Sequence, residues 1–446
     1  MEAMMVDVEE LKARVQDAMD QRSEELVGVA QQVLQNPEPG YREQKTSRYV
    51  QQQFERLGLP FRAGLALTGV KAVLQGGAPG PTVAVLGELD SLVVFDHPHA
   101  DPQTGAAHAC GHHAQIGMLL GVATALVHSG VMPHLSGRVV FFAVPAEELI
   151  EVEYRDGLRR AGKIEFLGGK PELLRLGELD DVDMAMLTHT TGNPEDGKLA
   201  LAGTNNGLVV KRILYVGRGA HAGASPHLGV NALNAAMLGL QAIHALRETF
   251  REDDTVRVHP IITKGGEAVS AVPSDVRLET FVRAKSIEAV RAWDTKVDRA
   301  LRAGALAVGA KVRITTIPGY LPLNNNPAMA QLYRQNAVNL VGEEHVRQIG
   351  HRTASTDMGD LSQVLPAIQP YAGGAEGVSH GADYLVHDYV QAVINPAKVM
   401  AMTVIDLLAG GAAKAKEIKA TAKLPLAKEG YLNLVRGFAR EEEWEA

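Results

Sequence analysis

The sequence predicts an α/β fold in which a discontinuous first domain carries an inserted ferredoxin-like domain. Three short apolar runs, at 82–90, 138–148 and 181–190, alternate with helical patterns, as the buried strands of an α/β sheet do. From residue 208 the strand and helix patterns follow the order βαββαβ, which is the order of a ferredoxin-like module. The α/β pattern then resumes near residue 327. The module therefore interrupts the first domain.

Chain length and composition fit this organisation. The chain has 446 residues, of which 46% are hydrophobic and 22% are charged, as expected of a globular protein with two cores. We assign residues 1–207 and 325–446 to the discontinuous domain and residues 208–324 to the inserted domain, a candidate lid. At the N-terminus, residues 8–35 read as one amphipathic helix.

Charge and cysteine content exclude several classes of protein. The net charge of −8 argues against a nucleic-acid partner, which would require a basic surface. One cysteine excludes an internal disulfide. No run approaches the eighteen uninterrupted apolar residues of a membrane span, and the N-terminus has no apolar signal core. We therefore expect a cytoplasmic protein that binds neither nucleic acid nor membrane.

Each apolar run ends on residues that can do chemistry. Asp90 ends the first run, Glu147 and Glu148 end the second, and His189 ends the third. Ligands of open α/β sheets bind outside the carboxyl ends of the strands. We therefore expect these side chains to share one crevice, together with the sequence HACGHH at 108–113.

The HACGHH sequence predicts a metal site. Its cysteine, Cys110, is the only one in the chain and is separated from His112 by one glycine. Thiolate and imidazole are favoured ligands of zinc and related divalent metals, although a buried, inert cysteine beside unrelated histidines is the alternative. A set that could hold two metals comprises Cys110, His112, Glu148, His189 and His380. Beside them, Glu147 could take a proton from a metal-bound water.

The inserted domain has two histidines of its own in a glycine-rich turn. His221 and His227 lie between a strand and a helix pattern, where Ser225 and Pro226 are helix start signals. One interpretation is that this turn only begins the helix and has no role in catalysis. Alternatively, an imidazole lowered from the lid over a metal could stabilise a developing oxyanion.

In these motifs the chain resembles the metal-dependent amidohydrolases of the aminoacylase, carboxypeptidase and dipeptidase family, and within it the aminobenzoyl-glutamate hydrolase-like branch. The resemblance covers roughly residues 25–430 and rests on GELDSL, HACGH, PAEE, HAGASPHLGVNAL, ASTDMGDLS and SHG. It implies a di-metal catalytic core of the aminopeptidase/carboxypeptidase type. It also implies one or two divalent ions per subunit, with zinc the first choice and manganese or cobalt next, and a homodimer or higher homo-oligomer formed through the lid.

The resemblance implies how the ligands divide between the metals. Cys110 would be shared by the two ions. His112 and Glu148 would complete the site of one ion, and His189 and His380 the site of the other.

The resemblance also implies roles around the metals. Glu147 would be the general base, Asp90 would orient a ligand, and His221 would reach into the site of a partner subunit. The predicted substrate-binding residues are His113, His227, Ser270 and Arg283.

Three departures from the family pattern surround the predicted metal site. His113 stands where the family usually has Asp or Asn, and Ser270 stands where it commonly has Asn. Residues 149–177 replace a short Gly-rich loop with a longer, charged segment. These changes leave the ligands in place, so hydrolytic chemistry transfers more safely than substrate identity.

The leading functional hypothesis is hydrolysis of a C–N bond in a small molecule, the amide of an N-acyl amino acid or a small dipeptide. The second hypothesis is a hydrolytic deaminase acting on an activated aromatic or amidine amine, which the changes at 149–177 and Ser270 motivate. The third is a non-catalytic, metal-dependent binding protein on an inherited fold.

Overall fold

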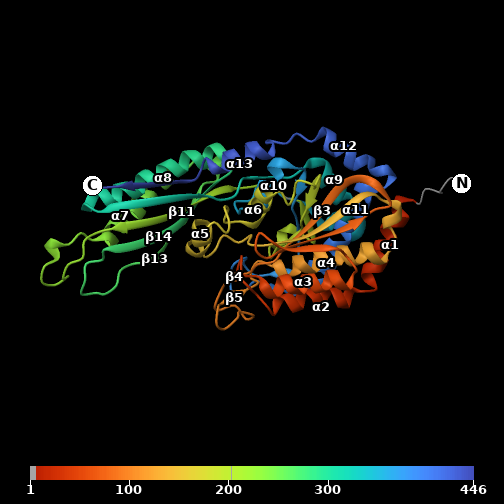
Figure 1. The fold of residues 1–446 in the computed structure, drawn as a ribbon, viewed down its shortest axis with the longest axis horizontal. Coiled ribbons are helices and arrows are strands. Elements are labelled where there is room, and N and C mark those ends of the chain that lie inside the picture. Colours follow the sequence, from red (N-terminus) through yellow and green to blue (C-terminus); the bar gives the residue numbers. More distant parts are fainter. Residues whose placement is uncertain (1–6, 202, 446) are drawn as a thin grey trace.

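Two six-stranded sheets organise the chain in the computed structural model, which describes residues 7–201 and 203–445. Figure 1 shows the two sheets along the long axis of the molecule, with helix α1 (Val8–Asp20) at one end and the lid at the other. This arrangement confirms the predicted α/β fold with a separate lid.

The first sheet is mixed and carries the predicted buried strands. In spatial order it contains β1 (Phe61–Leu65), β2 (Gly69–Gln75), β6 (Ser136–Val144), β3 (Ala78–Glu88), β7 (Met184–Met186) and β18 (Ala367–Ile368). β3 pairs in parallel with β6 and β7, and β7 with β18. Their carboxyl ends therefore meet at one edge, as the apolar runs predict.

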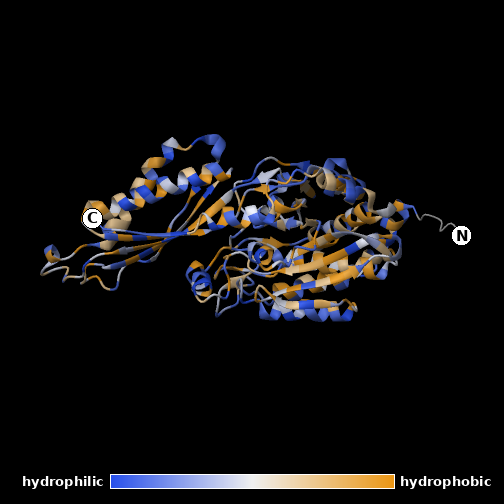
Figure 2. Cartoon of the chain, turned by 45° about the horizontal axis from the view of Figure 1, so that its top comes forward, coloured by the Kyte–Doolittle hydropathy of each residue, from blue (hydrophilic) through white to orange (hydrophobic). Residues whose placement is uncertain are grey.

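Both faces of this sheet are covered, which explains why its strands read as continuous apolar runs. Val83 and Val85 of β3 belong to one hydrophobic core, and Ala84 and Leu86 to another on the opposite face. The first core includes α1, α2 (Ser23–Leu34), α3 (Gln44–Arg56), α4 (His112–His128), α9 (Pro327–Val341), α11 (Asn395–Leu408) and α12 (Ala413–Thr421). The second includes α6 (Gly169–Leu176), α10 (Met358–Val364) and α13 (Lys428–Arg436). In Figure 2 the apolar residues of these elements gather in the interior.

The predicted N-terminal helix is two helices. α1 ends at Asp20 and α2 begins at Ser23. Both contact α4, and the break lets each helix turn its own apolar face toward it.

The lid is an antiparallel sheet with two helices on one face. Its elements are β11 (Gly207–Val216), α7 (Ala232–Leu246), β12 (Arg257–Val258), β13 (Ile261–Lys264), β14 (Asp275–Ala284), α8 (Ile287–Val308) and β15 (Lys311–Pro318). The strand order β12-β14-β11-β15, with β13 beside β14, is that of the predicted ferredoxin-like module.

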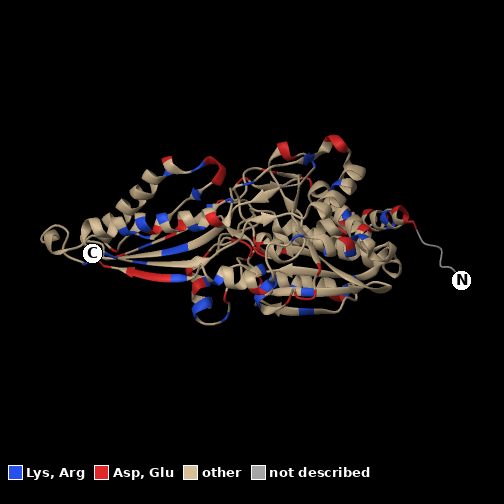
Figure 3. Cartoon of the chain, turned by 90° about the horizontal axis from the view of Figure 1, so that it is seen from above, with Lys and Arg blue, Asp and Glu red and all other residues tan. Residues whose placement is uncertain are grey.

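One more strand joins the lid from the far end of the chain. β22 (Arg440–Trp444) pairs antiparallel with β15, although the sequence placed residues 325–446 with the first domain. The run of glutamates in β22 reads as a solvated tail, but Glu443 Oε2 lies 2.6 Å from Arg313 Nη2 across the pair. Figure 3 shows β22 as an acidic edge strand of the lid. Residues 440–444 therefore extend the lid sheet.

Small sheets extend the first domain beside the strand ends. A four-stranded sheet contains β17 (Val346–Gln348), β9 (Leu199–Leu201), β19 (Pro370–Ala372) and β8 (His189–Thr190). Two-stranded sheets pair β10 (Thr204–Asn205) with β16 (Leu323–Asn324), β20 (Ala375–Glu376) with β21 (Leu385–Val386), and β4 (Leu92–Val93) with β5 (Ala106–Ala107).

One helical stretch, Val390–Leu408, is long and apolar enough to cross a membrane. Its most apolar window is 89% buried inside the protein, which is the environment of a core helix.

Candidate metal centre and substrate cavity

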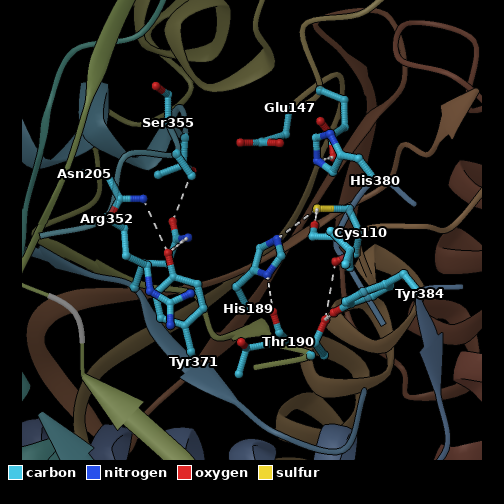
Figure 4. Close-up of a pocket in the computed structure, with 18 of the residues that line it drawn as sticks. Cys110, Glu147, His189, Thr190, Asn205, Arg352, Ser355, Tyr371, His380 and Tyr384 are labelled. Carbon is cyan, nitrogen blue, oxygen red and sulfur yellow. Dashed lines mark hydrogen bonds and ion pairs between the residues drawn. The ribbon is translucent and has the colours of Figure 1, made fainter. Parts of the chain in front are cut away.

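Three of the four predicted strand-end residues, Glu147, Glu148 and His189, line one cavity of about 700 Å³, and Asp90 is buried behind it. The first domain contributes the predicted ligands Cys110, Glu148, His189 and His380, together with Glu147. The lid contributes His259, Phe281 and Arg283 from β14 and the segment before it. Figure 4 shows Glu147, His189 and His380 directed toward the region of the Cys110 sulfur. The structure thus gathers residues that lie far apart in the sequence.

Gly111 shapes the turn between the two HACGHH ligands. It adopts φ 87° and caps the N-terminus of α4, which begins at His112. A Cβ atom there would lie 2.0 Å from Thr190 Oγ1, and left-handed backbone is costly for other residues. Glycine is therefore required both by the conformation and by the close approach of Thr190.

Asp90 holds His112 in the orientation that a metal ligand needs. His112 Nδ1 lies 2.9 Å from the Asp90 carbonyl oxygen and 3.3 Å from Asp90 Oδ1. Because both are acceptors, Nδ1 carries a proton and Nε2 faces the cavity side. Asp90 Oδ2 also accepts the backbone N–H of Glu148 at 2.9 Å. The predicted orienting role of Asp90 thus has contacts to two candidate ligands.

The donor atoms form two groups that share the cysteine. Cys110, His112 and His189 place one ligand atom each within 4.8 Å of one another, and so do Cys110, Glu148 and His380. This division differs from the pairing implied by the family resemblance. However, His112 Nε2 also lies 3.9 Å from Glu148 Oε1, so the assignment of ligands to individual ions stays a prediction.

The residues present fit a pair of divalent cations. The buried atoms His112 Nε2 and Glu148 Oε1 have no hydrogen bond of acceptable geometry among the described residues. His189 Nδ1 donates to the Thr190 carbonyl at 2.7 Å, which turns Nε2 toward Cys110 Sγ at 3.4 Å. Imidazole nitrogens, a carboxylate and a thiol gathered around one point are ligands that a divalent metal would bind.

Cys110 is set up as a thiolate. Burial and the Glu148 carboxylate raise its pKa, but the imidazoles of His189 and His380 outweigh them and lower the pKa to about 5. The thiolate is the form that binds metals. The lone cysteine is therefore neither inert nor a simple core residue.

The two adjacent glutamates have opposite electrostatic environments. Burial, with the carboxylates of Glu88 and Glu148, raises the pKa of Glu147 well above its ordinary value. Burial also raises the pKa of Glu148, but His380, whose Nε2 lies 3.4 Å from Glu148 Oε1, lowers it below its ordinary value overall. Carboxylates whose pKa values diverge in this way suit different tasks: Glu147 a proton acceptor and Glu148 a metal ligand.

Hydrogen bonds from buried side chains hold the loop that presents these glutamates. Ala146 adopts φ 55°, its N–H donates to Glu43 Oε1 at 2.8 Å, and its carbonyl accepts from Arg155 Nη1 at 3.2 Å. The hydroxyl of Tyr320 donates to the Glu147 carbonyl. The side chains of Glu43, Arg155 and Tyr320 are buried, so they fix the path of the backbone into the cavity.

A buried charge cluster under the centre was missed by the sequence reasoning. Lys170 Nζ lies 2.5 Å from Glu88 Oε1 and also contacts Asp357 Oδ1. Glu88 Oε2 lies 3.0 Å from His112 Nε2, so the cluster touches the candidate ligands. Glu88 and Asp357 belong to the GELDSL and ASTDMGDLS motifs, which were the available signal, but neither residue was given a role.

Of the predicted substrate-binding residues, the structure brings only Arg283 to the cavity. His221, His227 and Ser270 are not among the lining residues, and all three are exposed in the lid. His221 Nδ1 accepts the backbone N–H groups of Gly223 and Ala224 at 3.2 and 3.0 Å. In a single chain these residues therefore do not line the described cavity.

His113, predicted to bind substrate, does not line this cavity. His113 is buried and lines a separate cavity with His97, His99 and His108. Its Nε2 lies 3.4 Å from the Tyr389 hydroxyl. Because His112 and His113 are successive residues of α4, their side chains leave the helix about 100° apart, and only His112 faces the centre.

The lid side of the cavity presents an arginine without a counter-ion. Arg283 Nε donates to His259 Nε2 at 3.3 Å, and within the described part of the chain no carboxylate lies within 4.0 Å of its guanidinium. By contrast, Arg352 on the opposite wall pairs with Asp196 and stacks over Tyr371 at 3.9 Å. An anionic group of a ligand would pair with the Arg283 guanidinium.

The fold and this site together define a metal-dependent hydrolase. A family model described as Peptidase family M20/M25/M40 matches residues 84–405, and the chain therefore belongs to this family. It is a metal-dependent hydrolase of amide or peptide bonds. The family prediction is confirmed, and this finding contradicts the hypothesis of a non-catalytic binding protein.

Curated relatives extend over nearly the whole chain. The Xaa-Arg dipeptidase of Mus musculus is 29% identical over 429 residues and the match covers 90% of each chain. The Xaa-Arg dipeptidase of Homo sapiens is 28% identical over 464 residues, with 96% of each chain covered. IAA-amino acid hydrolase ILR1-like 6 of Arabidopsis thaliana is 25% identical over 381 residues, with 81% of this chain and 76% of the relative covered.

Solved structures share the fold. A Bacillus subtilis protein described as a dinuclear metal binding peptidase from the M20 family superposes with a TM-score of 0.63 at 19% identity, covering 86% of this chain and 98% of that one. The aminobenzoyl-glutamate utilization protein from Klebsiella pneumoniae gives 0.66 at 18% identity, covering 88% and 98%.

Proposed function

We propose that the enzyme hydrolyses the amide bond of an N-acyl amino acid or small dipeptide that carries a free carboxylate. The observation that supports this most directly is Arg283, which lines the same cavity as Glu147 and the candidate ligands and has no carboxylate partner there. A planar guanidinium binds a carboxylate with two parallel hydrogen bonds. The substrate carboxylate on the lid side would place the amide over the metal centre.

The chain supplies the proton transfers. When bound, the metals supply Lewis acidity and a water of lowered pKa. Glu147 accepts a proton from the attacking water and delivers it to the leaving nitrogen, as a general base and then a general acid. Burial raises the pKa of Glu147, which makes its carboxylate a stronger proton acceptor. Asp90 meanwhile keeps His112 in place.

The names of two relatives support the substrate class. Xaa-Arg dipeptidase and IAA-amino acid hydrolase both denote cleavage of an amino-acid conjugate. A deaminase would require no carboxylate on its substrate, whereas Arg283 offers such a carboxylate a charged partner at the cavity wall.

The test is a mass-spectrometric screen of N-acyl amino acids, dipeptides and their C-terminal carboxamides. We expect cleavage of acids and poor cleavage of carboxamides. Arg283→Met should raise KM for acids about tenfold or more, the effect of losing a charged hydrogen bond, and leave KM for carboxamides unchanged. Equal cleavage of acids and carboxamides would refute the proposal, and release of ammonia without a second amine product would support the deaminase instead.

We propose zinc as the metal, with manganese or cobalt as alternatives. The proposed donors are one thiolate, three imidazoles and one carboxylate, a set that suits zinc by ligand softness. Elemental analysis of the purified protein, with activity regained after chelation by each metal in turn, tests this choice. Full reactivation by manganese alone would overturn it.

We also propose that the enzyme is a homodimer through the lid. The predicted role of His221 requires a second copy of the chain, because His221 does not line the cavity of its own subunit. Sedimentation analysis of the purified enzyme tests the oligomeric state.

A further inference from the structure

The charged segment 149–177 connects the metal-binding loop to the lid. It follows Glu148 directly and contains α5 (Val152–Arg160) and α6. Figure 1 shows α5 at the junction between the lid strands and the first domain. Successive residues of α5 contact the two domains, which makes the helix a mechanical link between them.

On one side, α5 is fixed to the loop that carries the glutamates. Arg155 is 1% exposed, and its Nη1 donates to the carbonyls of Ala146 and Leu167 at 3.2 and 2.9 Å. Its guanidinium also lies 5.5 Å from the ring centroid of Tyr41. The helix therefore cannot move without disturbing the residue that precedes Glu147.

On the other side, α5 is fixed to two strands of the lid. Asp156, whose side chain is buried, pairs with Arg212 of β11. Glu153 Oε1 lies 3.1 Å from Arg212 Nη2 and 3.1 Å from Arg277 Nη1 of β14. Two acidic residues of one short helix thus hold two neighbouring strands.

Apolar contacts accompany these ion pairs. Leu149, Val152 and Leu167 of the segment belong to one buried cluster with Leu208, Val210, Ile317 and Tyr320, and Phe281 packs against it. The Asp156–Arg212 pair is screened little by solvent because the Asp156 side chain is buried, whereas the Glu153–Arg277 pair is exposed. The junction therefore has the character of a fixed interface.

The face of β14 that meets α5 also carries Arg283. Burial alternates along this strand, so Arg277, Glu279, Phe281 and Arg283 share the face turned away from the lid helices. Arg277 and Arg283 are six positions apart, roughly 20 Å along the strand. Anchoring the strand at Arg277 therefore fixes the angle at which Arg283 enters the cavity.

We propose that Glu153 and Asp156 are positioning residues that hold the lid in the orientation in which Arg283 stays over the cavity. This inference rests on the carboxylate-binding role proposed for Arg283. The segment that departs from the family pattern thus acts on substrate affinity from outside the cavity. Substitution of Glu153 and Asp156 leaves Arg155, which holds the Ala146 carbonyl beside Glu147, in place.

The experiment compares the wild type with the double variant Glu153→Gln/Asp156→Asn. Nitroxide labels at Glu55→Cys on α3 and Leu306→Cys on α8 report the distance between the domains by electron–electron resonance. Both positions are exposed, and wild-type enzyme treated with the same reagent measures any labelling of Cys110, which lines the cavity. The matched control is Lys311→Gln, which loses an exposed ion pair with Glu445 within the lid and does not border the pocket that the α5 side chains line.

We expect the double variant to broaden and shift the distance distribution. We also expect a KM for the carboxylate substrate raised about tenfold, with kcat changed less than about threefold. High salt should move the wild type in the same direction, and Asp156→Glu should restore most of the affinity lost in Asp156→Asn. The control should match the wild type in both readouts.

An unchanged distance distribution would overturn the inference, and so would a shifted distribution with an unchanged KM. The role of Arg283 is decided separately by Arg283→Met. If that variant leaves KM unchanged, the function proposed for Arg283 fails, and the distance distribution alone decides whether α5 sets the lid orientation. Should the double variant fold poorly, Arg277→Gln removes the Glu153 contact from the lid side and leaves the Asp156–Arg212 pair in place.

Discussion

Lys170 Nζ lies 2.5 Å from Glu88 Oε1 beneath the metal centre, and both side chains are sealed from solvent. Lys170 also contacts Asp357 and donates its backbone N–H to Asp357 Oδ2 at 3.0 Å. One ammonium thus contacts two buried carboxylates, and one of them, Glu88, also contacts His112. The charged groups that surround the metal centre therefore include Lys170, Glu88 and Asp357, which lie behind its candidate ligands.

We predict that Lys170→Met lowers the free energy of unfolding by roughly 3–5 kcal/mol, because removing one partner leaves buried charge uncompensated. Lys428→Met is the control, since Lys428 pairs with Asp180 on the surface and its loss should cost less than about 1 kcal/mol. Urea denaturation of the metal-free proteins measures both. Similar losses in the two variants would contradict the role given to the buried cluster.

We predict that Glu147→Gln retains metal and loses turnover by several orders of magnitude. The amide cannot accept the proton, and general base catalysis contributes about 10²–10⁴-fold. Elemental analysis and kcat measured on the same preparation separate the two effects. Near-normal turnover would exclude Glu147 as the base, whereas loss of metal would identify it as a ligand.

The pH dependence of Cys110 tests the electrostatics of the centre. In the metal-free protein its pKa of about 5 predicts a thiolate at neutral pH, visible by its ultraviolet absorbance and lost as pH falls through 5. The pKa of Cys110 is lower in the folded protein than in the unfolded chain, so the thiolate adds to the free energy of unfolding. This contribution is complete above about pH 9 and disappears as the pH falls to 5. His380→Ala should raise the pKa of Cys110, because it removes an imidazole that lowers it. A transition near the ordinary thiol pKa in the wild type would contradict this environment.

The strand ends were predictable from the sequence, and the layer beneath them was not. The apolar runs before Asp90, Glu147 and His189 placed these residues at one sheet edge, because parallel strands end together. The partners Lys170 and Glu88 are 82 positions apart in the chain, and no periodicity links one buried ion to another.

The roles of the two flanking segments also depended on three-dimensional contacts. The charged segment 149–177 was recognised as a departure from the family pattern, but its contacts with Arg212 and Arg277 form only when the lid packs against it. The acidic strand β22 likewise reads as a tail until β15 supplies Arg313. In both cases the sequence alone does not distinguish charges that form ion pairs from charges that face the solvent.

The turn at Gly111 gives a sharp prediction about the metal centre. Gly111→Ala introduces a Cβ at 2.0 Å from Thr190 Oγ1 on backbone with φ 87°, so we expect metal affinity to fall at least tenfold, as in other ligand-positioning variants. Gly28→Ala is the control, because no atom lies within 4 Å of the added Cβ and alanine favours the helix by about 1 kcal/mol. Metal titration followed by calorimetry measures the difference. Equal affinities would show that the turn does not position Cys110 and His112.

The last prediction concerns whether His221 acts in the site of a partner subunit. Glu147→Gln inactivates the site of its own subunit, and His221→Ala would inactivate the site of the partner. In a mixed dimer, the subunit carrying His221→Ala keeps Glu147 and receives the intact His221 of the Glu147→Gln subunit. Random reassortment of equal amounts makes half of the dimers mixed, each with one complete site, so activity should recover to about a quarter of wild type. The two variants are unfolded and refolded together, and kcat is compared with that of each variant refolded alone. If His221 instead serves its own subunit, each site of the mixed dimer lacks either Glu147 or His221. No recovery above the separately refolded variants is then expected.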